Sequence, residues 1–188
     1  EMTVTDGGIT KVIVFSGDIG PHHVPILRDP DPPEKADLVC LESTYGDREH
    51  PPMQPSLDQF IKIIRDTIFN KQRVLIPAFA IGRTQLILYY LGQAVREGKL
   101  QADIPVYLDS PAAMRATMVY RKHGELYDTE ASKLARSGTF EQDLKKFRII
   151  ESPAESRALN ESWDPCVIIA GSGMCEGGRI VHHIRHNI

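Results

Sequence analysis

Cysteine is scarce in this sequence. Cys40, Cys166 and Cys175 are its three cysteines in 188 residues, and none of them forms a C-x-x-C pair. This spacing argues against a disulfide framework or a zinc ribbon and indicates a reducing, cytoplasmic setting. Long apolar runs are missing too, because none approaches the roughly 18 residues that a membrane span needs. No membrane partner is therefore expected.

Neither sign of charge dominates. The chain carries 22 Lys and Arg against 25 Asp and Glu, a formal net charge of −3. This balance excludes nucleic-acid binding through bulk positive charge, although a local basic groove remains open. With 41% hydrophobic and 25% charged residues, the composition is that of a globular protein, which excludes disordered and fibrous classes.

The first third of the chain is rich in turns. Apolar runs over residues 12–15 and 37–41 predict two buried strands, and Asp6-Gly7 predicts a hairpin before the first. A proline-rich loop covers residues 21–33. A second proline-rich stretch, residues 50–55, marks the best internal boundary.

Strands alternate with helices from Ser56 onward, and Ser56 is the expected N-cap of the first helix. This alternation predicts βαβ units and an α/β fold with a mostly parallel sheet. Helices are expected over residues 56–70, 82–96, 111–123, 140–147 and from 178 on, and strands over 73–77, 106–108, 147–150 and 166–170.

Ligands of open α/β sheets bind beyond the carboxyl ends of the strands. The residues expected there are polar or small: Asp18, Glu42, residues 78–84, 109–111 and 171–174. A ligand site is therefore expected among these residues.

Two of these strand ends are suited to phosphate. Arg83 and Thr84 begin a helix directly after Gly82, where free backbone N–H groups and the helix dipole attract anions. For this junction alone, a plain turn with Arg83 in solvent is the favoured alternative. Residues 171–179 hold four glycines but fit neither G-x-G-x-x-G nor a Walker A loop. A phosphate-bearing ligand and a plain glycine turn explain this stretch equally well.

Acidic residues and histidines supply candidate metal ligands. Asp18 has the hard carboxylate donor that a metal takes, although a Gly-Asp turn residue is the commoner explanation. Glu42 follows an apolar strand, so its carboxylate should be paired or metal-linked. His182, His183 and His186 are interpreted as partly exposed helix residues.

Taken together, these stretches resemble the β-CASP branch of the metallo-β-lactamase superfamily. The resemblance rests on Ser16-Gly17-Asp18-Ile19-Gly20, Pro25-Ile26-Leu27-Arg28-Asp29-Pro30, Leu41-Glu42-Ser43-Thr44-Tyr45-Gly46, Pro77-Ala78-Phe79-Ala80-Ile81-Gly82-Arg83-Thr84-Gln85, Asp109-Ser110-Pro111 and Ser172-Gly173-Met174 through Gly178-Arg179, in this order. It covers nearly the whole chain, with residues 112–165 the least distinctive.

The resemblance implies a zinc-dependent nuclease that hydrolyses RNA phosphodiester bonds with two metal ions. Asp18 would bridge the two zinc ions, and Glu42 would orient a metal-binding histidine. The residues implied in RNA or phosphate binding are Arg83, Thr84, Ser110, Ser172, Gly173 and Arg179. RNA is the expected partner, and a homodimer is left open.

The family's histidine motifs, H-x-H-x-D-H among them, do not occur in the sequence. A catalytic zinc ion normally has three protein ligands, so the chain is expected to be an inactive fragment that binds zinc weakly or not at all. Residues 1–50 would end a metallo-β-lactamase half of αββα type, as a short β-rich remnant, and residues 51–188 would form most of a Rossmann-like β-CASP domain. Two alternatives remain: a non-catalytic homologue that binds RNA or scaffolds a partner, and an unrelated nucleotide-binding α/β enzyme.

Overall fold

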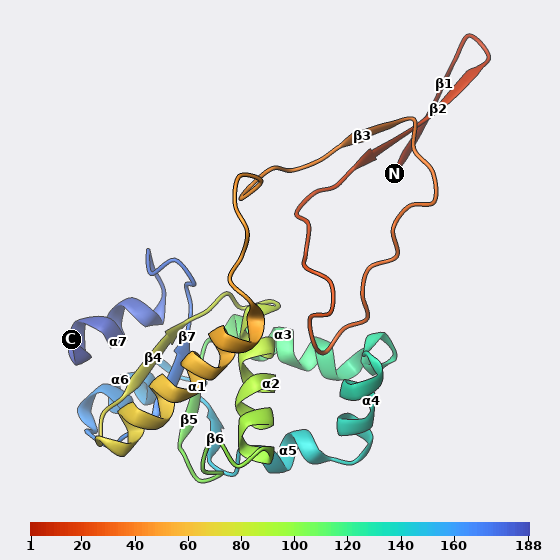
Figure 1. The fold of residues 1–188 in the computed structure, drawn as a ribbon. Helices are drawn as coiled ribbons and strands as arrows, with labels where there is room; N and C mark the ends of the chain where they lie inside the picture. Colours follow the sequence, from red (N-terminus) through yellow and green to blue (C-terminus); the bar gives the residue numbers. More distant parts are fainter.

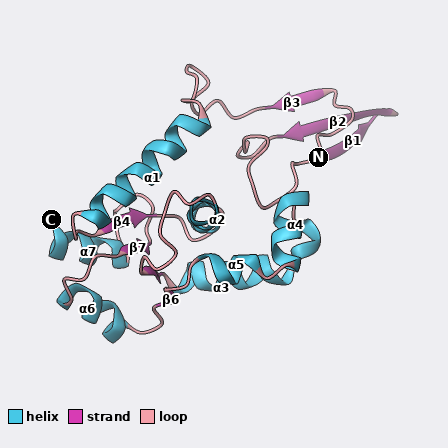
Figure 2. Ribbon diagram, turned by 60° about the horizontal axis from the view of Figure 1, so that its bottom comes forward, coloured by secondary structure: helices cyan, strands magenta, loops and turns pink.

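The computed structural model describes the backbone of residues 1–188 and all side chains except those of residues 140 and 141. Its strands form two separate sheets (Figures 1 and 2). The first has the order β1-β2-β3, with bounds Met2–Asp6, Ile9–Phe15 and Leu38–Cys40. The second has the order β4-β7-β5-β6, with bounds Val74–Pro77, Val167–Ala170, Val106–Asp109 and Phe147–Ile149.

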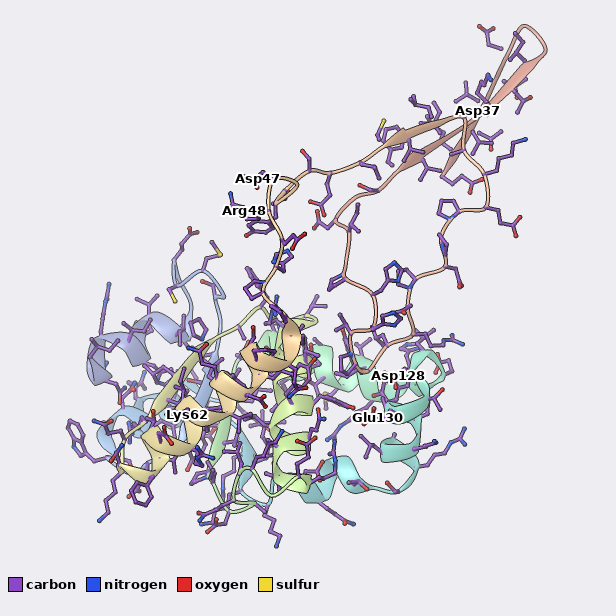
Figure 3. All side chains as sticks on the ribbon, viewed as in Figure 1. Asp37, Asp47, Arg48, Lys62, Asp128 and Glu130 are labelled. Carbon is purple, nitrogen blue, oxygen red and sulfur yellow. The ribbon has the colours of Figure 1, made fainter. Side chains whose placement is uncertain are left out.

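The N-terminal sheet begins with the hairpin that the sequence predicts. Asp6 pairs with Ile9, and Gly7 and Gly8 both have positive φ, 54° and 81°, as a two-residue type I′ turn requires. Strand β3 runs parallel to β2. Asp37 fixes β3 to β2, because its carboxylate accepts hydrogen bonds from Lys11 Nζ (2.9 Å) and Val12 N (2.8 Å) (Figure 3).

The expected burial of β2 and β3 is wrong. Phe15, Leu38 and Val39 are each at least half exposed. Figure 1 shows the reason: this sheet projects away from the rest of the molecule, and none of the described helices covers either face. The apolar runs formed strands as expected, but burial requires a second layer that a local pattern does not reveal.

The second sheet is parallel throughout, which confirms the α/β prediction. Its central strand β7 is fully buried. Helices α1 (Met53–Phe69) and α2 (Arg83–Arg96) pack on one face through residues such as Ile64 and Leu91. Helices α6 (Pro153–Glu161) and α7 (Arg179–Asn187) pack on the other face through Leu159 and Ile180. The core is therefore a three-layer sandwich.

Most helix predictions hold, but some bounds differ and some helices were not predicted. Helix α1 begins at Met53, and Ser56 is not its N-cap, because Ser56 Oγ donates to Pro52 O within the first turn. Helix α3 (Pro111–Lys122) ends as expected and is followed by the short 3-10 helix η1 (Gly124–Leu126). Helix α5 (Thr139–Asp143) is shorter than the expected helix over 140–147, and α4 (Thr129–Arg136) and α6 were not predicted.

The proline-rich loop after β2 is hydrogen-bonded to the helical part of the molecule. We call residues 21–33 the strap. Ile26 is buried, its N–H donates to Asp128 Oδ2 (2.9 Å), and its carbonyl accepts from Asp128 N (2.9 Å). Arg28 N donates to Leu126 O (3.1 Å). The strap is thus hydrogen-bonded to the start of α4, where Figure 3 places Asp128.

Across the helices that the structure describes, none combines the length and the apolar character that crossing a membrane requires.

Candidate nucleic-acid interface

Three loops meet where the parallel strands end. Because β4, β7 and β5 are adjacent and parallel, the segments that follow them lie at one edge of the sheet. A Cβ atom on Gly171 would lie 3.7 Å from both Ala78 O and Ser110 Oγ, and one on Gly173 would lie 2.7 Å from Phe79 Cδ2. We call residues 78–83, 109–111 and 171–178 the carboxyl edge. The sequence predicted this convergence.

The glycine-rich part of the carboxyl edge closes on itself. Ser172 N donates to Gly177 O (3.1 Å), and Ile180 N at the start of α7 donates to Gly171 O (3.0 Å). Gly178 has a φ of +73°, and a Cβ there would lie only 2.3 Å from Gly171 O. No other residue fits at position 178, so this glycine is required by the turn itself.

Several groups of the carboxyl edge remain available to a ligand. Ser172 Oγ is buried and has no hydrogen-bond partner among the side chains and backbone that the structure describes. The Phe79 ring lies against Gly173 and is still 54% exposed. Arg83 is exposed at the first position of α2. An unsatisfied hydroxyl, an open aromatic face and a cation are the groups that bind single-stranded nucleic acid.

Two other predicted contact residues have structural hydrogen bonds. Thr84 is buried, and its hydroxyl donates to Phe79 O (2.8 Å). The amides of Arg83 and Thr84, expected to be free for an anion, donate to Ile81 O (3.0 Å) and Phe79 O (3.2 Å). Ser110 Oγ accepts from Ala113 N (3.2 Å) and caps α3. That bond uses an oxygen lone pair, so the Ser110 O–H proton can still be donated.

Arg179 also has internal partners. Its Nη1 atom donates to Asp109 Oδ1 (2.5 Å) and to Ile150 O (3.2 Å), and its Nη2 atom donates to Glu151 O (3.3 Å). These bonds tie the start of α7 to the end of β5 and to the segment before α6. The structure therefore gives this guanidinium a structural role beside the one expected from sequence.

A buried polar network surrounds Asp109, and sequence reasoning missed it. Asp109 Oδ2 accepts from Ser156 Oγ (2.5 Å) and lies 2.6 Å from His183 Nε2. Burial alone would raise the pKa of this carboxyl, but hydrogen bonds from His183, Ser156 and Arg179 outweigh burial and hold the pKa below its usual value. The expectation that His183 is partly exposed is wrong, because it is fully buried.

The network is not a nucleophilic triad. Ser156 and His183 both bond to the same oxygen of Asp109 and not to each other, so His183 cannot take a proton from Ser156. A signal was present in the sequence, since Asp109 ends an apolar strand as Glu42 does, and a buried carboxylate needs a partner. The partner is not recognisable locally, because His183 lies 74 residues further along the chain.

Glu42 and Asp18 lie in the N-terminal part. Glu42 Oε1 accepts from Ile19 N (2.6 Å), and Glu42 N donates to Ser16 Oγ (2.9 Å). Hydrogen bonds from Ile19 N–H and then from Thr44 lower the pKa of the Glu42 carboxyl. Glu42 thus holds the turn that carries Asp18, while the Asp18 side chain itself is exposed.

These residues do not make a zinc site by themselves. A catalytic zinc ion takes three protein ligands. Among the described side chains, no three histidines, cysteines or carboxylates come close enough together to hold a metal ion. Asp18 remains a predicted ligand, but the donor set in residues 1–188 does not fit zinc without further ligands.

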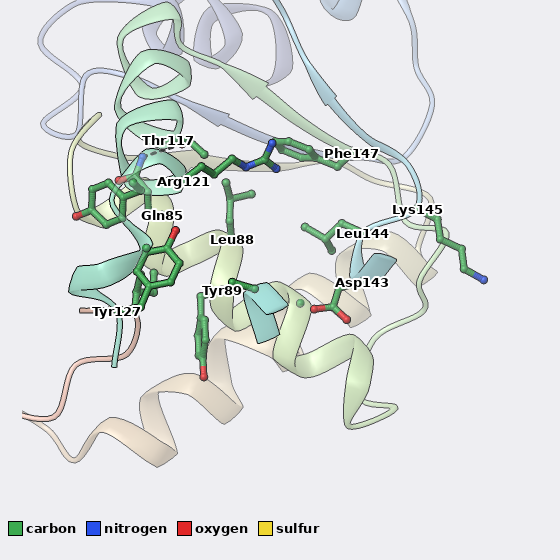
Figure 4. Close-up of a pocket in the computed structure, with 15 residues that line it drawn as sticks. Gln85, Leu88, Tyr89, Thr117, Arg121, Tyr127, Asp143, Leu144, Lys145 and Phe147 are labelled. Carbon is green, nitrogen blue, oxygen red and sulfur yellow. Dashed lines mark hydrogen bonds between the residues drawn. The ribbon is translucent and has the colours of Figure 1, made fainter. Parts of the chain in front are cut away.

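A separate cavity of about 540 Å³ lies between α2, α3 and β6 (Figure 4). Its walls include Leu88, Tyr127 and Phe147, and it shares no residue with the carboxyl edge. Asp143 also lines it: burial raises the pKa of this carboxyl, while the charge and the hydrogen bond of Arg96 oppose the increase. No pattern in the sequence predicts this cavity.

The fold and the carboxyl edge define an α/β protein with a parallel sheet and a polar, glycine-lined ligand edge. Residues 84–188 match the family model of the Beta-Casp domain. The chain therefore belongs to the β-CASP family, as the resemblance indicated.

Named relatives support this assignment. The chain is 38% identical over 181 residues to Ribonuclease TTHA0252 of Thermus thermophilus, covering 96% of this chain and 41% of that protein. It is 30% identical over 180 residues to Transcription termination factor FttA of Methanosarcina mazei, covering 92% and 28%. It is 28% identical over 167 residues to Endoribonuclease ysh1 of Schizosaccharomyces pombe, covering 88% and 21%. The chain thus spans about two fifths or less of the length of these relatives.

Proposed function

We propose that this chain is part of an RNA nuclease and that its carboxyl edge binds single-stranded RNA. The observation that carries the proposal is the convergence of an unpartnered buried hydroxyl, an exposed aromatic ring and an exposed arginine on one edge, at Ser172, Phe79 and Arg83. The names of the relatives, two of them ribonucleases, support RNA as the substrate.

Each group has a distinct part in RNA binding. Arg83 attracts a phosphate through its charge, and the Ser172 hydroxyl donates to a phosphate oxygen. The Phe79 ring stacks on a base without selecting its sequence. These few placed contacts are compatible with a net charge of −3, because no bulk positive charge is required.

The hydrolytic centre is proposed to lie at the turn that Glu42 holds, with Asp18 as a metal ligand. Zinc is the metal that the resemblance implies, and ligands outside residues 1–188 would have to complete its coordination. The role of Glu42 in this proposal is to hold that turn, through its bonds to Ile19 and Ser16.

A second candidate is a non-catalytic RNA-binding subunit. The observation that favours it is the carboxyl edge itself, because the contacts proposed there for RNA need no metal ion. Metal content and cleavage by the parent protein, with and without Asp18→Ala, decide between the two. Loss of metal and cleavage together supports the nuclease, and RNA binding without either supports the alternative.

The RNA-binding proposal is tested with Phe79→Ala. Base stacking on an aromatic side chain contributes about 1–3 kcal/mol, so the Kd for a fluorescent single-stranded RNA should rise roughly five- to hundredfold. Phe69 is the matched control, because it is an exposed phenylalanine at the end of α1, which leads into the opposite edge of the sheet. Equal effects of Phe79→Ala and Phe69→Ala in fluorescence anisotropy would refute the proposal.

A further inference from the structure

One buried ionisable side chain has no part in the contacts proposed above. His183 lies in the middle of α7, fully buried. Both of its ring nitrogens have a partner: Nε2 lies 2.6 Å from Asp109 Oδ2, and Nδ1 lies 2.9 Å from Asn160 Oδ1. The hydrogen-bonding capacity of these partners determines which nitrogens carry a proton.

The proton on Nδ1 follows from two asparagine amides. Arg73 Nη1 donates to Asn187 Oδ1 (3.1 Å), and Asn187 Nδ2 donates to the His183 carbonyl (2.7 Å), so the orientation of the Asn187 amide is fixed. The second proton of that Nδ2 is donated to Asn160 Oδ1 (3.2 Å). Asn160 therefore presents an oxygen to His183. Because this oxygen can only accept, His183 Nδ1 must carry a proton.

The proton on Nε2 follows from Asp109. Arg179 and Ser156 donate to the two oxygens of this carboxyl, and its pKa is lowered, so it is ionised at neutral pH. A carboxylate only accepts hydrogen bonds. His183 Nε2 must therefore donate to it.

We infer that His183 is held as an imidazolium that donates from both ring nitrogens, and that it acts as a positioning residue for the glycine-rich turn over residues 171–178. The imidazolium fixes one oxygen of Asp109, so that the other oxygen faces Arg179. Arg179 is the first residue of α7 and directly follows Gly178, where the turn ends. The ring thereby sets the place where the turn ends and α7 begins.

The charges around the ring are compatible with this state. Asp109 on β5 supplies one negative charge in direct contact, and Arg179 lies on the other oxygen of that carboxylate. Helix α6 contributes the uncharged Ser156 and Asn160. A buried charge is tolerated when it is paired and hydrogen-bonded, as it is here.

Two ionisable groups lie beyond this first layer. Arg73 precedes β4 and reaches the ring only through Asn187. Cys166 precedes β7 in the same core cluster, and burial raises the pKa of its thiol, which therefore stays neutral. Neither group supplies a negative charge, so Asp109 is the counter-charge in direct contact with the ring.

Nitrogen NMR of the full chain with labelled histidine reads the protonation state directly. The two ring nitrogens of His183 should both show the shift of a protonated nitrogen at neutral pH, whereas a neutral tautomer shows one protonated and one bare nitrogen. In Asp109→Asn, which removes the counter-charge, the ring should become neutral. A neutral ring in the unmodified chain would overturn the inference, and this measurement requires no variant to fold.

Positioning is read by hydrogen exchange. In His183→Gln the amides of residues 171–178 should exchange at least about tenfold faster, because the second donor is lost and α7 is held less firmly. His182→Gln is the matched control, since His182 is the exposed neighbour on the same helix. Unchanged exchange in the turn of a folded His183→Gln protein would overturn the positioning role.

The importance of the turn for RNA rests on the proposed function, and the two ideas can fail separately. If the inference is right, His183→Gln weakens RNA binding about tenfold and His182→Gln leaves it unchanged. If the unmodified chain binds no RNA while the spectra and the exchange rates come out as expected, the proposed function is refuted and the positioning role stands.

Discussion

Asp109 is a carboxylate at the end of β5 that has charged and polar partners inside the protein. It is fully buried, and two helices supply its partners: Arg179 and His183 lie on α7, and Ser156 lies on α6. A buried ion pair contributes little compared with an apolar pair of the same shape, but breaking it leaves an uncompensated charge. Substitutions at this position should therefore affect stability far more than surface changes do.

Asp109→Asn should lower the free energy of unfolding by about 3–5 kcal/mol, because Arg179 and His183 lose their counter-charge. Urea denaturation measures this. Asp103→Asn is the control, since Asp103 is an exposed aspartate with a long ion pair, 3.8 Å from its Oδ2 to Lys146 Nζ. Equal effects of the two substitutions would show that the network is not stabilising.

The lowered pKa of Asp109 also predicts a pH dependence. A carboxyl whose pKa is lower in the folded state contributes stability above its unfolded pKa of about 3.9 and loses it as the pH falls through the folded pKa. Below about pH 4, the stability difference between the unmodified chain and Asp109→Asn should therefore shrink as the pH falls. A difference that keeps growing as the pH falls below about 4 would contradict this assignment.

Among the elements, the glycine-rich turn is the least tolerant of change. Gly178→Ala forces a side chain into a φ of +73° and against Gly171 O, so it should cost at least about 2 kcal/mol and disorder the turn. Gly177→Ala is a close control, because a Cβ at position 177 meets nothing within 4 Å. Thermal unfolding and hydrogen exchange of residues 171–178 check this, and similar behaviour of the two variants would contradict it.

The strap depends on one side chain that serves two elements. Asp128 Oδ1 caps α4 through Ala131 N (2.7 Å), and its Oδ2 accepts from Ile26 N (2.9 Å). Asp128→Ala should therefore cost about 2–3 kcal/mol and expose the Arg28–Asp29 bond to trypsin. Ser152→Ala, which removes an N-cap far from the strap, should cost about 1 kcal/mol and leave that bond protected. Equal proteolysis of the two variants would rule out this role of Asp128.

The elements that the sequence predicted share a physical reason. Strands β4, β5 and β7 are short apolar runs closed by turn residues, and parallel strands covered by helices on both faces of the sheet produce this pattern. Helices α4 and α6 were missed, although Asp128 and Ser152 are capping residues that mark their starts. Their position depends on packing that a local pattern does not contain.

Only some features of the candidate site could be predicted, for a similar reason. The carboxyl edge follows from topology alone, so its loops could be found without knowing the contacts. The hydrogen-bond partners could not be predicted, because Asp109 and His183 meet only after the sheet and α7 have packed together. Thr84 and Arg179 were predicted as RNA or phosphate contacts, and their internal bonds to Phe79 O and Asp109 were not predicted.

At the scale of the whole molecule, the two sheets differ in how fully they are covered. The sheet of β4–β7 has helices on both faces, whereas β1–β3 exposes apolar side chains such as Phe15 and Val39. The division into residues 1–50 and 51–188 stays a prediction, as do zinc binding, the cytoplasmic location and a homodimer. The relatives are at least about twice as long as this chain, so the complete nuclease is proposed for the parent protein.

The central claim is that the carboxyl edge contacts the RNA backbone, and the salt dependence of binding tests it most directly. Each phosphate contact to single-stranded nucleic acid adds about 0.7 to the slope of log K against log salt. Arg83→Ala should lower this slope by about 0.7, and Arg65→Ala, at an exposed arginine on α1, should not change it. A slope that is the same in the unmodified chain and in Arg83→Ala would contradict the account.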